Sequence, residues 1–252
     1  MASRVMMLTN NPDADVADLS DLIHQDQALA GNVLRIANSA AYRVGEPIVS
    51  LRQAVMQLGL GVLGEIAVAA CLNHEGLRAP GYEPLRKRML LHAFITGGFA
   101  KELARRKRRN VESMFLCGLL HSVGKTVTLR LIANAQSGAA TKLTEGEVAP
   151  LIAAHQADIA ARVTVAWKLP QQVHVVAVHH ASPETAPEFV DETKLVALAA
   201  HIAGWVTLND PPDEAAVRAL PAWAELNFYP DDVDAVLERR AVLEESAAIF
   251  MS

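Results

Sequence analysis

The sequence predicts an all-α fold, and three observations support this prediction. Hydrophobic residues make up 51% of the 252 residues and charged residues only 20%, the balance of a globular chain that buries a real core. Aromatic residues make up only 5%, while Ala and Leu are abundant, which favours helices over strands. Apolar residues recur at helical spacing, and no stretch of useful length alternates between apolar and polar residues as a strand does.

Four helices are expected in the N-terminal part of the chain. The first opens at residues 12–15, where a proline suits the first turn and two acids complement the helix dipole. Asp26 is expected to cap the second. Ser50, with Gln53 three residues later, forms a capping box for the third. The fourth is expected at residues 62–73, so this part predicts a helical bundle.

A loop at residues 76–84 is the expected boundary between two parts of the fold. The helices after it are expected at residues 85–109, 110–121, 125–135, 146–168, 171–180, 191–208, 213–220 and 231–251. The chain is therefore expected to divide into an N-terminal helical part at 1–80, a second helical bundle at 81–210 and a C-terminal helical extension at 211–252.

The stretch at residues 116–125 is the centre of this pattern. Its apolar residues at helical spacing form one buried face, which consists of Leu116, Leu119, Leu120 and Val123. His121 lies beside this face near the end of the helix, and Gly124 is expected to supply the left-handed residue that stops the helix. A polar residue in this position is either a hydrogen-bonded core histidine or a site residue, and the local pattern leaves both open.

The motifs of the chain resemble a known family. His121-Ser122 and its flanking apolar run resemble the His-Asp signature of the HD metal-dependent phosphohydrolases, with serine in the aspartate position. A further set of motifs, taken in order, is similar to the HDOD domain, an HD-related output domain of bacterial signalling proteins. These motifs lie at residues 26–29, 34–42, 50–59, 167–170, 179–180 and 195–200, with Gln27 where the family usually has proline.

The resemblance covers residues 13–205 and carries expectations about fold and role. It implies an N-terminal helical bundle packed on an HD-like helical bundle. It also implies regulation or protein interaction rather than established catalysis.

The resemblance further implies a degenerate metal site. In HD hydrolases, histidines and at least two aspartates hold divalent metal ions, which polarise phosphate and generate hydroxide. The corresponding positions here are His92, His121, His155 and His179 or His180, with Ser122 and Ala200 in place of the two aspartates. A serine hydroxyl substitutes poorly for an anionic ligand, and alanine offers none. We therefore expect a vestigial, metal-free polar core with no catalytic residue and no cofactor.

Two alternatives to the metal-free core stay open. One is a working dinuclear hydrolase. The other is a mononuclear site whose ligands are histidines alone, namely His92, His121, His155 and His179.

Arg35, Asn38 and Ser39 form a second group of candidates at the end of the second helix. An arginine followed by asparagine and serine could contact an anion or a partner protein. The structural alternative, which we favour, is that Asn38 caps the helix while Arg35 ties the two parts of the fold together.

Three further patterns are weaker. The basic cluster at residues 105–109 could contact nucleic-acid phosphates, but it also suits a helix C-terminus, and few aromatic residues lie near it for base stacking. Ser122 lacks the tight turn of a nucleophilic serine, and Gly124-Lys125 lacks the glycine-rich loop of a nucleotide-binding motif. Cys71 and Cys117 lie in apolar runs and are expected to be buried, reduced thiols.

Charge and hydropathy indicate which classes of protein and which location to expect. The net charge of −5 argues against a generally basic nucleic-acid binder. No signal peptide is evident, and the longest apolar run, at 195–208, is too short to span a bilayer, so we expect a cytoplasmic protein that does not bind membranes. The favoured function is a non-catalytic signalling module whose partner is an unidentified signalling protein. The alternative is a degenerate phosphohydrolase or phosphodiesterase that acts on a nucleotide.

Overall fold

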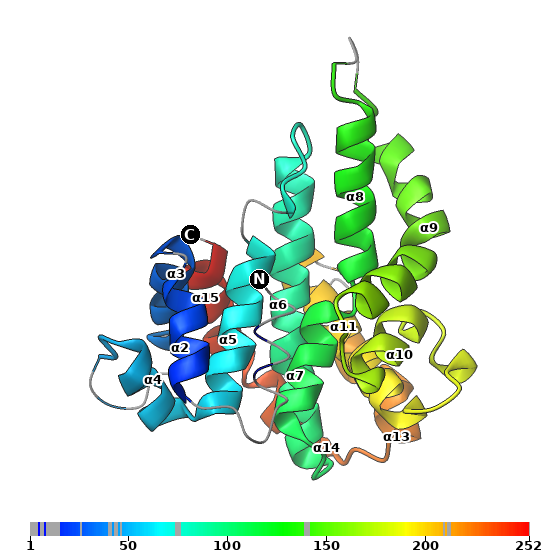
Figure 1. Cartoon of the computed structure of the whole chain (residues 1–252). Helices are drawn as coiled ribbons and strands as arrows, with labels where there is room; N and C mark the ends of the chain where they lie inside the picture. Colours follow the sequence, from blue (N-terminus) through cyan, green and yellow to red (C-terminus); the bar gives the residue numbers. More distant parts are fainter. Residues whose placement is uncertain are drawn as a thin grey trace.

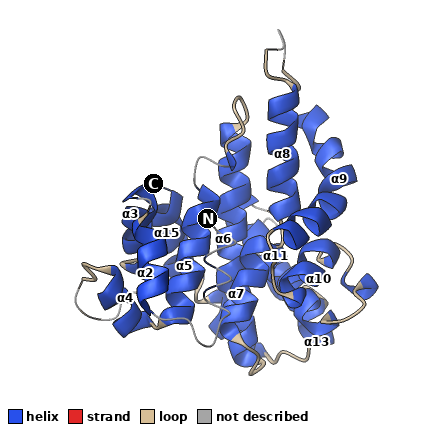
Figure 2. Cartoon of the chain, in the orientation of Figure 1, coloured by secondary structure: helices blue, strands red, loops and turns tan. Residues whose placement is uncertain are grey.

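The computed structural model describes residues 5, 8, 16–25, 27–39, 42, 45, 47–73, 77–138, 142–208, 210 and 213–251. Over these ranges the chain forms helices, turns and loops and no strand, which confirms the predicted all-α fold (Figures 1 and 2). The predicted helix start at 12–15 and the predicted cap at Asp26 lie outside the described residues.

The described residues of the N-terminal part form four helices that pack as a bundle. They are α2 (Val16–His24), α3 (Gln27–Ala37), α4 (Leu51–Leu58) and α5 (Leu60–Asn73). The Ser50 hydroxyl accepts a hydrogen bond from the Gln53 amide at 3.1 Å, which confirms the predicted cap of α4. Gly59 ends α4 with a φ of 84°, a left-handed conformation that suits a residue without a Cβ.

The second part is an HD-like bundle built around one long helix. Its helices are α6 (Glu83–Arg106), α7 (Val111–Leu120), α8 (Val123–Ala135), α9 (Glu145–Ala166), α10 (Gln171–His179) and α11 (Val190–Leu208), with a short 3-10 helix, η2 (Pro183–Thr185), before the last. The long helix ends at Arg106 and not at Arg109 as predicted, because Arg108 turns the chain with a φ of 53°. Asn110 then caps α7 through the Ser113 amide at 2.9 Å.

Close packing of the HD-like bundle depends on glycine. A Cβ added to Gly118 on α7 would lie 2.7 Å from the Cα of Gly97 on α6, so these two helices approach with backbone against backbone. Gly124 lies inside α8 and does not stop a helix, so the prediction of a left-handed residue there is wrong. A Cβ on Gly124 would collide with the carbonyl oxygen of Gln156, which shows that this glycine lets α8 and α9 pack together.

The C-terminal segment returns to the N-terminal bundle. It forms α12 (Glu214–Arg218), α13 (Ala222–Glu225), α14 (Pro230–Leu237) and α15 (Arg240–Met251). The predicted helix at 231–251 is thus two helices, because residues 238–239 form a turn. Helix α15 packs against α3, α5 and α6 (Figure 1). Its Phe250 ring stacks on Phe94 at a centroid distance of 4.7 Å.

One continuous core joins these parts, and a buried ion pair adds to the junction between α5 and α6. A single cluster of buried apolar side chains runs from Val5 to Phe250. Within it, Lys101 on α6 donates to the carboxylate of Glu65 on α5 at 2.9 Å, and Glu65 is only 1% exposed. Breaking such a pair leaves a buried charge, so it helps to fix how the N-terminal bundle sits on α6.

The α8–α9 hairpin projects from the body of the molecule (Figure 1). It carries a small second core against the start of α6, which contains Tyr82, Leu129, Ala133, Val148 and Ile152. One stretch of the described chain, residues 113–135, has the length and hydropathy of a membrane span, but 72% of its apolar window is buried in the protein. The turn at 121–122 divides this stretch between α7 and α8, so its apolar character is that of core helices.

Candidate functional site

Three histidines from separate elements meet in the HD-like bundle. His92 lies on α6, His121 in the turn between α7 and α8, and His180 directly after α10. The ring centroids of His92 and His121 are 5.5 Å apart, and those of His121 and His180 are 4.9 Å apart with their planes at 86°. His121 is therefore the middle ring of a histidine cluster, and it is only 1% exposed.

Each ring is held by a backbone carbonyl. His92 donates from Nε2 to the oxygen of Ala200 at 3.1 Å, His121 from Nδ1 to the oxygen of Gly118 at 2.6 Å, and His180 from Nδ1 to the oxygen of Ala177 at 3.2 Å. Because a carbonyl oxygen only accepts, each bonded nitrogen carries the proton. The second nitrogen of each neutral ring is then an acceptor. Nδ1 of His92 lies 3.5 Å from the Thr96 hydroxyl, whereas Nε2 of His180 is buried without a partner among the described residues.

Burial keeps these rings neutral. Burial, followed by the smaller effect of the positive charge of Lys125, lowers the pKa of His92 and that of His180 to about 4. The pKa of His121 lies well below its usual range, first because of burial and then because of His180, His92 and Lys125. At neutral pH the cluster thus consists of uncharged imidazoles beside the positive charge of Lys125.

These residues do not fit a divalent metal ion. Ser122 and Ala200, which the sequence resemblance predicts at the aspartate positions of the HD signature, bring no carboxylate to the cluster, and the backbone oxygen of Ala200 accepts the His92 hydrogen bond. Within the described ranges no group of three or more histidine, cysteine, aspartate or glutamate side chains is placed to hold a metal. The site combines neutral imidazoles with the ammonium of Lys125, and a cation repels another cation.

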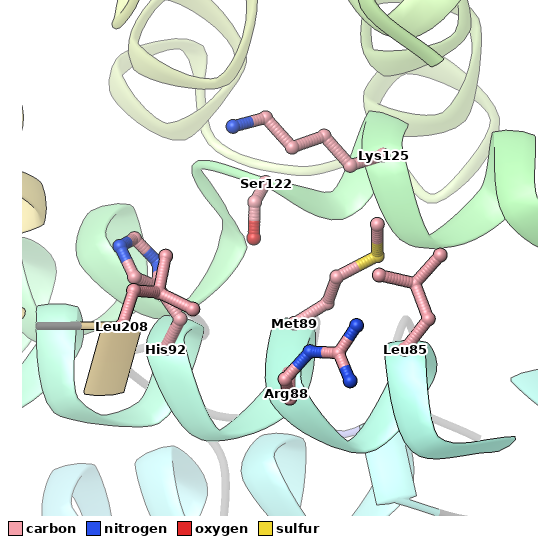
Figure 3. Close-up of a pocket in the computed structure, with 7 residues that line it drawn as sticks. All are labelled: Leu85, Arg88, Met89, His92, Ser122, Lys125 and Leu208. Atoms are coloured by element: carbon pink, nitrogen blue, oxygen red, sulfur yellow. The ribbon is translucent and has the colours of Figure 1, made fainter. Parts of the chain in front are cut away.

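A cavity opens beside the histidine cluster (Figure 3). Its volume is about 220 Å³, and its wall consists of Leu85, Arg88, Met89, His92, Ser122, Lys125 and Leu208. Ser122 is 4% exposed, and its hydroxyl points into the space between His92 and Met89. Burial lowers the pKa of Lys125, whose side chain reaches over Ser122 from the first turn of α8.

The structure does not bring His155 and His179 into this cluster. His155 is exposed on α9, and it makes no ring contact with the other histidines described. The ring of His179 pairs instead with the Thr185 hydroxyl, 2.8 Å from its Nδ1, at an exposed position. Of the two adjacent histidines, His180 is therefore the one that faces the core.

Asn38 ties the end of α3 to the loop before α4. Its side-chain amide donates to the carbonyl oxygens of Leu34 at 2.9 Å and Ile48 at 2.7 Å, and its oxygen accepts from the Ile48 amide at 2.8 Å. Ser39 is fully buried, and Arg35 is half-buried in the last turn of α3. This geometry supports the structural interpretation of Asn38 over an anion site.

The basic cluster at residues 105–109 is occupied by contacts within the chain. Arg105 pairs with Glu102, Arg106 with Asp232, and Arg109 with Asp191 and Glu192. Lys107 donates to the carbonyl oxygen of Asn227 at 2.8 Å and lies 4.5 Å from the centre of the Phe228 ring. Arg106 and Lys107 therefore help to hold the C-terminal segment, and Arg109 contacts the start of α11, which favours a structural role for these three residues over phosphate binding.

Two features of the site were not predicted from the sequence. Lys125 was considered only as part of a nucleotide-binding motif, although its positive charge acts on the histidine cluster. Arg88 and Leu208 come from helices that the fold alone brings together. Cys117, by contrast, is buried as predicted, and burial raises the pKa of its thiol to about 12, so it is unreactive.

Comparisons with known proteins identify the family and the fold. The family model for the HDOD domain matches residues 1–183. A curated protein of Treponema pallidum, whose function is not characterised, is 28% identical over 202 residues. That match covers 75% of this chain but 38% of the relative, so the chain spans little more than a third of the relative's length.

Solved structures share the whole fold. An HDOD domain protein of unknown function from Geobacter sulfurreducens aligns over 99% of this chain and 90% of its own, with a TM-score of 0.71 and 24% identity. A Shewanella amazonensis protein, provisionally named a phosphohydrolase, aligns over 99% and 91% with a TM-score of 0.70 and 20% identity. A Marinobacter aquaeolei protein, provisionally named a signal transduction protein, aligns over 100% and 58% with a TM-score of 0.65 and 20% identity.

Proposed function

This chain belongs to the HDOD domain family, and from that membership we propose that it is a non-catalytic module of a bacterial signalling system that acts through contacts with another protein. The observation that carries the proposal is the chemistry of the vestigial HD site. Ser122 and Ala200 offer no anionic ligand, and Lys125 adds a positive charge beside the histidines. A site of this kind attracts neither one metal ion nor a pair of them, and HD hydrolysis depends on bound metal.

The surface offers some support for protein contacts. Val49 is 78% exposed in the loop before α4, and Met56 is 73% exposed on α4 itself. Large apolar side chains exposed within one short segment are common at protein interaction sites. We propose that the partner is a signalling protein and that α4 contributes to the contact.

A hydrolysis assay tests the non-catalytic part of the proposal. The purified chain is incubated with bis(p-nitrophenyl) phosphate and with cyclic and linear nucleotides, in the presence of Mg²⁺, Mn²⁺ or Ni²⁺. We expect the wild type and His121→Ala to give the same background rate. Metal-dependent turnover that is lost in His121→Ala would overturn the proposal and establish the alternative, a phosphohydrolase or phosphodiesterase that acts on nucleotides.

A capture experiment tests the partner. The tagged chain is cross-linked in cells of the source organism, and the captured proteins are compared with those of a Val49→Asp/Met56→Asp variant. Val165→Asp is the matched control, because Val165 is 69% exposed on α9, a different element. We expect a specific protein that the double variant loses and the control keeps. Identical capture by all three proteins would remove α4 from the contact.

A further inference from the structure

The cavity beside the histidine cluster has two hydrogen-bond donors without partners. Ser122 is 4% exposed, and its hydroxyl makes no side-chain hydrogen bond with any residue that the structure describes. Lys125 is half-buried, and no described carboxylate lies within ion-pair distance of its ammonium. Both residues line the cavity, so the hydroxyl and the ammonium are available to an acceptor that enters it.

The position of these donors adds to their preference for an anion. Ser122 immediately precedes α8, and Lys125 lies in its first turn. The N-terminus of a helix carries partial positive charge and free backbone amides, both of which favour a negative group. The hydroxyl, the ammonium and the helix end thus belong to one wall of the cavity (Figure 3).

The charge of the lining indicates how many negative charges the cavity accepts. Its two permanent cations are Arg88 and Lys125. Arg88 already pairs with Glu145, so Lys125 supplies the one positive charge that remains unpaired. A monoanion balances this charge, whereas a dianion would carry one uncompensated charge into a partly buried site.

The rest of the cavity is apolar. Leu85, Met89 and Leu208 line it, and Leu208 is 53% exposed, so the cavity is open to solvent on that side. An adjoining cavity of about 300 Å³ shares Leu85, Met89 and Lys125 and continues along α9 past Ala149, Ile152 and Ala153. Its two other lining residues are polar, namely Glu145, which pairs with Arg88, and Gln156. Together the two cavities offer a largely apolar path that starts at the ammonium group of Lys125.

We propose that this cavity binds a small organic monoanion, a carboxylate on a short apolar chain, with Lys125 and Ser122 on the carboxylate and Leu85 and Met89 on the chain. The inference rests on the proposed function, because it assigns a ligand to the site that has lost its metal-binding carboxylates. Such a ligand would bridge α6, α8 and α9, and so would connect a small molecule to the arrangement of the α8–α9 hairpin.

Calorimetric titration of the full chain with acetate, butyrate, hexanoate and octanoate tests the inference. We expect affinity to rise with chain length, by about fourfold for each methylene that becomes buried. Hexanol, which lacks the charge, and inorganic phosphate, which lacks the chain, should bind at least about tenfold more weakly than hexanoate. Phosphate binding tighter than hexanoate, or equal binding of hexanol, would overturn the inference.

Matched variants locate the site. Lys125→Met removes the unpaired charge and should weaken octanoate binding by about tenfold or more, whereas Lys125→Arg should keep most of it. Arg130→Met removes a positive charge from an exposed position on the same helix and should leave binding unchanged. Ser122→Ala, a smaller change, should also weaken binding and keeps the test decisive if Lys125→Met does not fold. Equal binding by wild type, Lys125→Met and Ser122→Ala would overturn the assignment.

The two proposals fail in different ways. If no carboxylate binds and no phosphodiester is hydrolysed, the ligand inference is wrong while the non-catalytic function stands. If metal-dependent hydrolysis appears and is lost in His121→Ala, the proposed function is wrong whatever the carboxylates do.

Discussion

The imidazole rings of His121 and His180 meet edge to face, with centroids 4.9 Å apart and planes at 86°. Each ring donates a hydrogen bond from Nδ1 to the carbonyl oxygen three residues before it, of Gly118 and Ala177 respectively. The backbone of two helix ends therefore sets the tautomer and the orientation of both rings. Two imidazoles packed in this way are stable together only while both are neutral, and this condition has consequences for pH, metal binding and stability.

Acid should destabilise the protein in a defined pH range. The pKa of His92 and that of His180 are about 4 in the folded chain, below the ordinary value of 6.5. Between pH 6.5 and pH 4 these histidines are therefore protonated in the unfolded chain but neutral in the folded chain. Their contribution to the free energy of unfolding is complete above pH 6.5 and is lost as the pH falls from there towards 4. Each such histidine contributes a slope of up to about 1.4 kcal/mol per pH unit within this range.

Urea unfolding at a series of pH values between 7.5 and 4 measures this slope. His180→Phe should have a shallower slope than the wild type, because the variant lacks one group that binds a proton only in the unfolded chain. His155→Phe is the control, since His155 is exposed, and its slope should match the wild type. Equal slopes in the wild type and His180→Phe would mean that His180 does not stay neutral on folding.

Asn38→Ala should destabilise the N-terminal bundle by roughly 1–3 kcal/mol, because it leaves the buried amide and carbonyl of Ile48 without the Asn38 side chain. Thermal or urea unfolding measures the change. Asn134→Ala, at an exposed position on α8, should stay within about 0.5 kcal/mol of the wild type. Unchanged stability of Asn38→Ala together with a lost partner would instead place Asn38 in an interface.

Gly118→Ala should destabilise the protein severely, by about 3 kcal/mol or more, because the added Cβ would lie 2.7 Å from the backbone of Gly97 and force α6 and α7 apart. The control is Gly31→Ala on α3, where a Cβ meets none of the described atoms within 4 Å. This change should be neutral or stabilising by up to about 1 kcal/mol. Comparable melting temperatures for the two variants would show that α6 and α7 have room to move apart.

Local sequence patterns predicted the helices and the buried stretch at 116–125, because apolar spacing and capping residues act over a few residues. Ser50 caps α4, and the predicted face of Leu119 and Leu120 is buried. The role of Gly124 was predicted wrongly because local sequence patterns do not distinguish a glycine that ends a helix from a glycine that lets a neighbouring helix pack closely. Only the position of Gln156 on α9 distinguishes the two roles.

The site was less predictable from the sequence, because it depends on the direction in which each side chain at a helix end points. His179 and His180 are adjacent in sequence, yet one bonds to the exposed Thr185 and the other faces His121. The half-buried charge of Lys125 is likewise a property of the packed helices, since the residues that desolvate it come from elements far apart in the chain.

Ser122→Asp should restore one anionic group to the histidine cluster. Next to Lys125 this carboxylate should neutralise the positive charge of the ammonium, and with the neutral imidazoles it should supply one anionic ligand, so the affinity for Mn²⁺ or Ni²⁺ should rise above that of the wild type. Ala200 still leaves the second carboxylate missing, so we expect no efficient hydrolysis. Metal titration followed by calorimetry measures the gain, and Ser137→Asp, at an exposed position, should show none.

The thermal melt of the wild-type protein with and without added metal tests the central claim, that the histidine cluster is a metal-free core. A ligand that prefers the native state raises the melting temperature, so the shift reports binding whatever its function. We predict no shift with saturating Mn²⁺ or Ni²⁺, and a metal-independent loss of roughly 1–3 kcal/mol in His121→Ala. A clear upward shift in the wild type that vanishes in His121→Ala would contradict the claim.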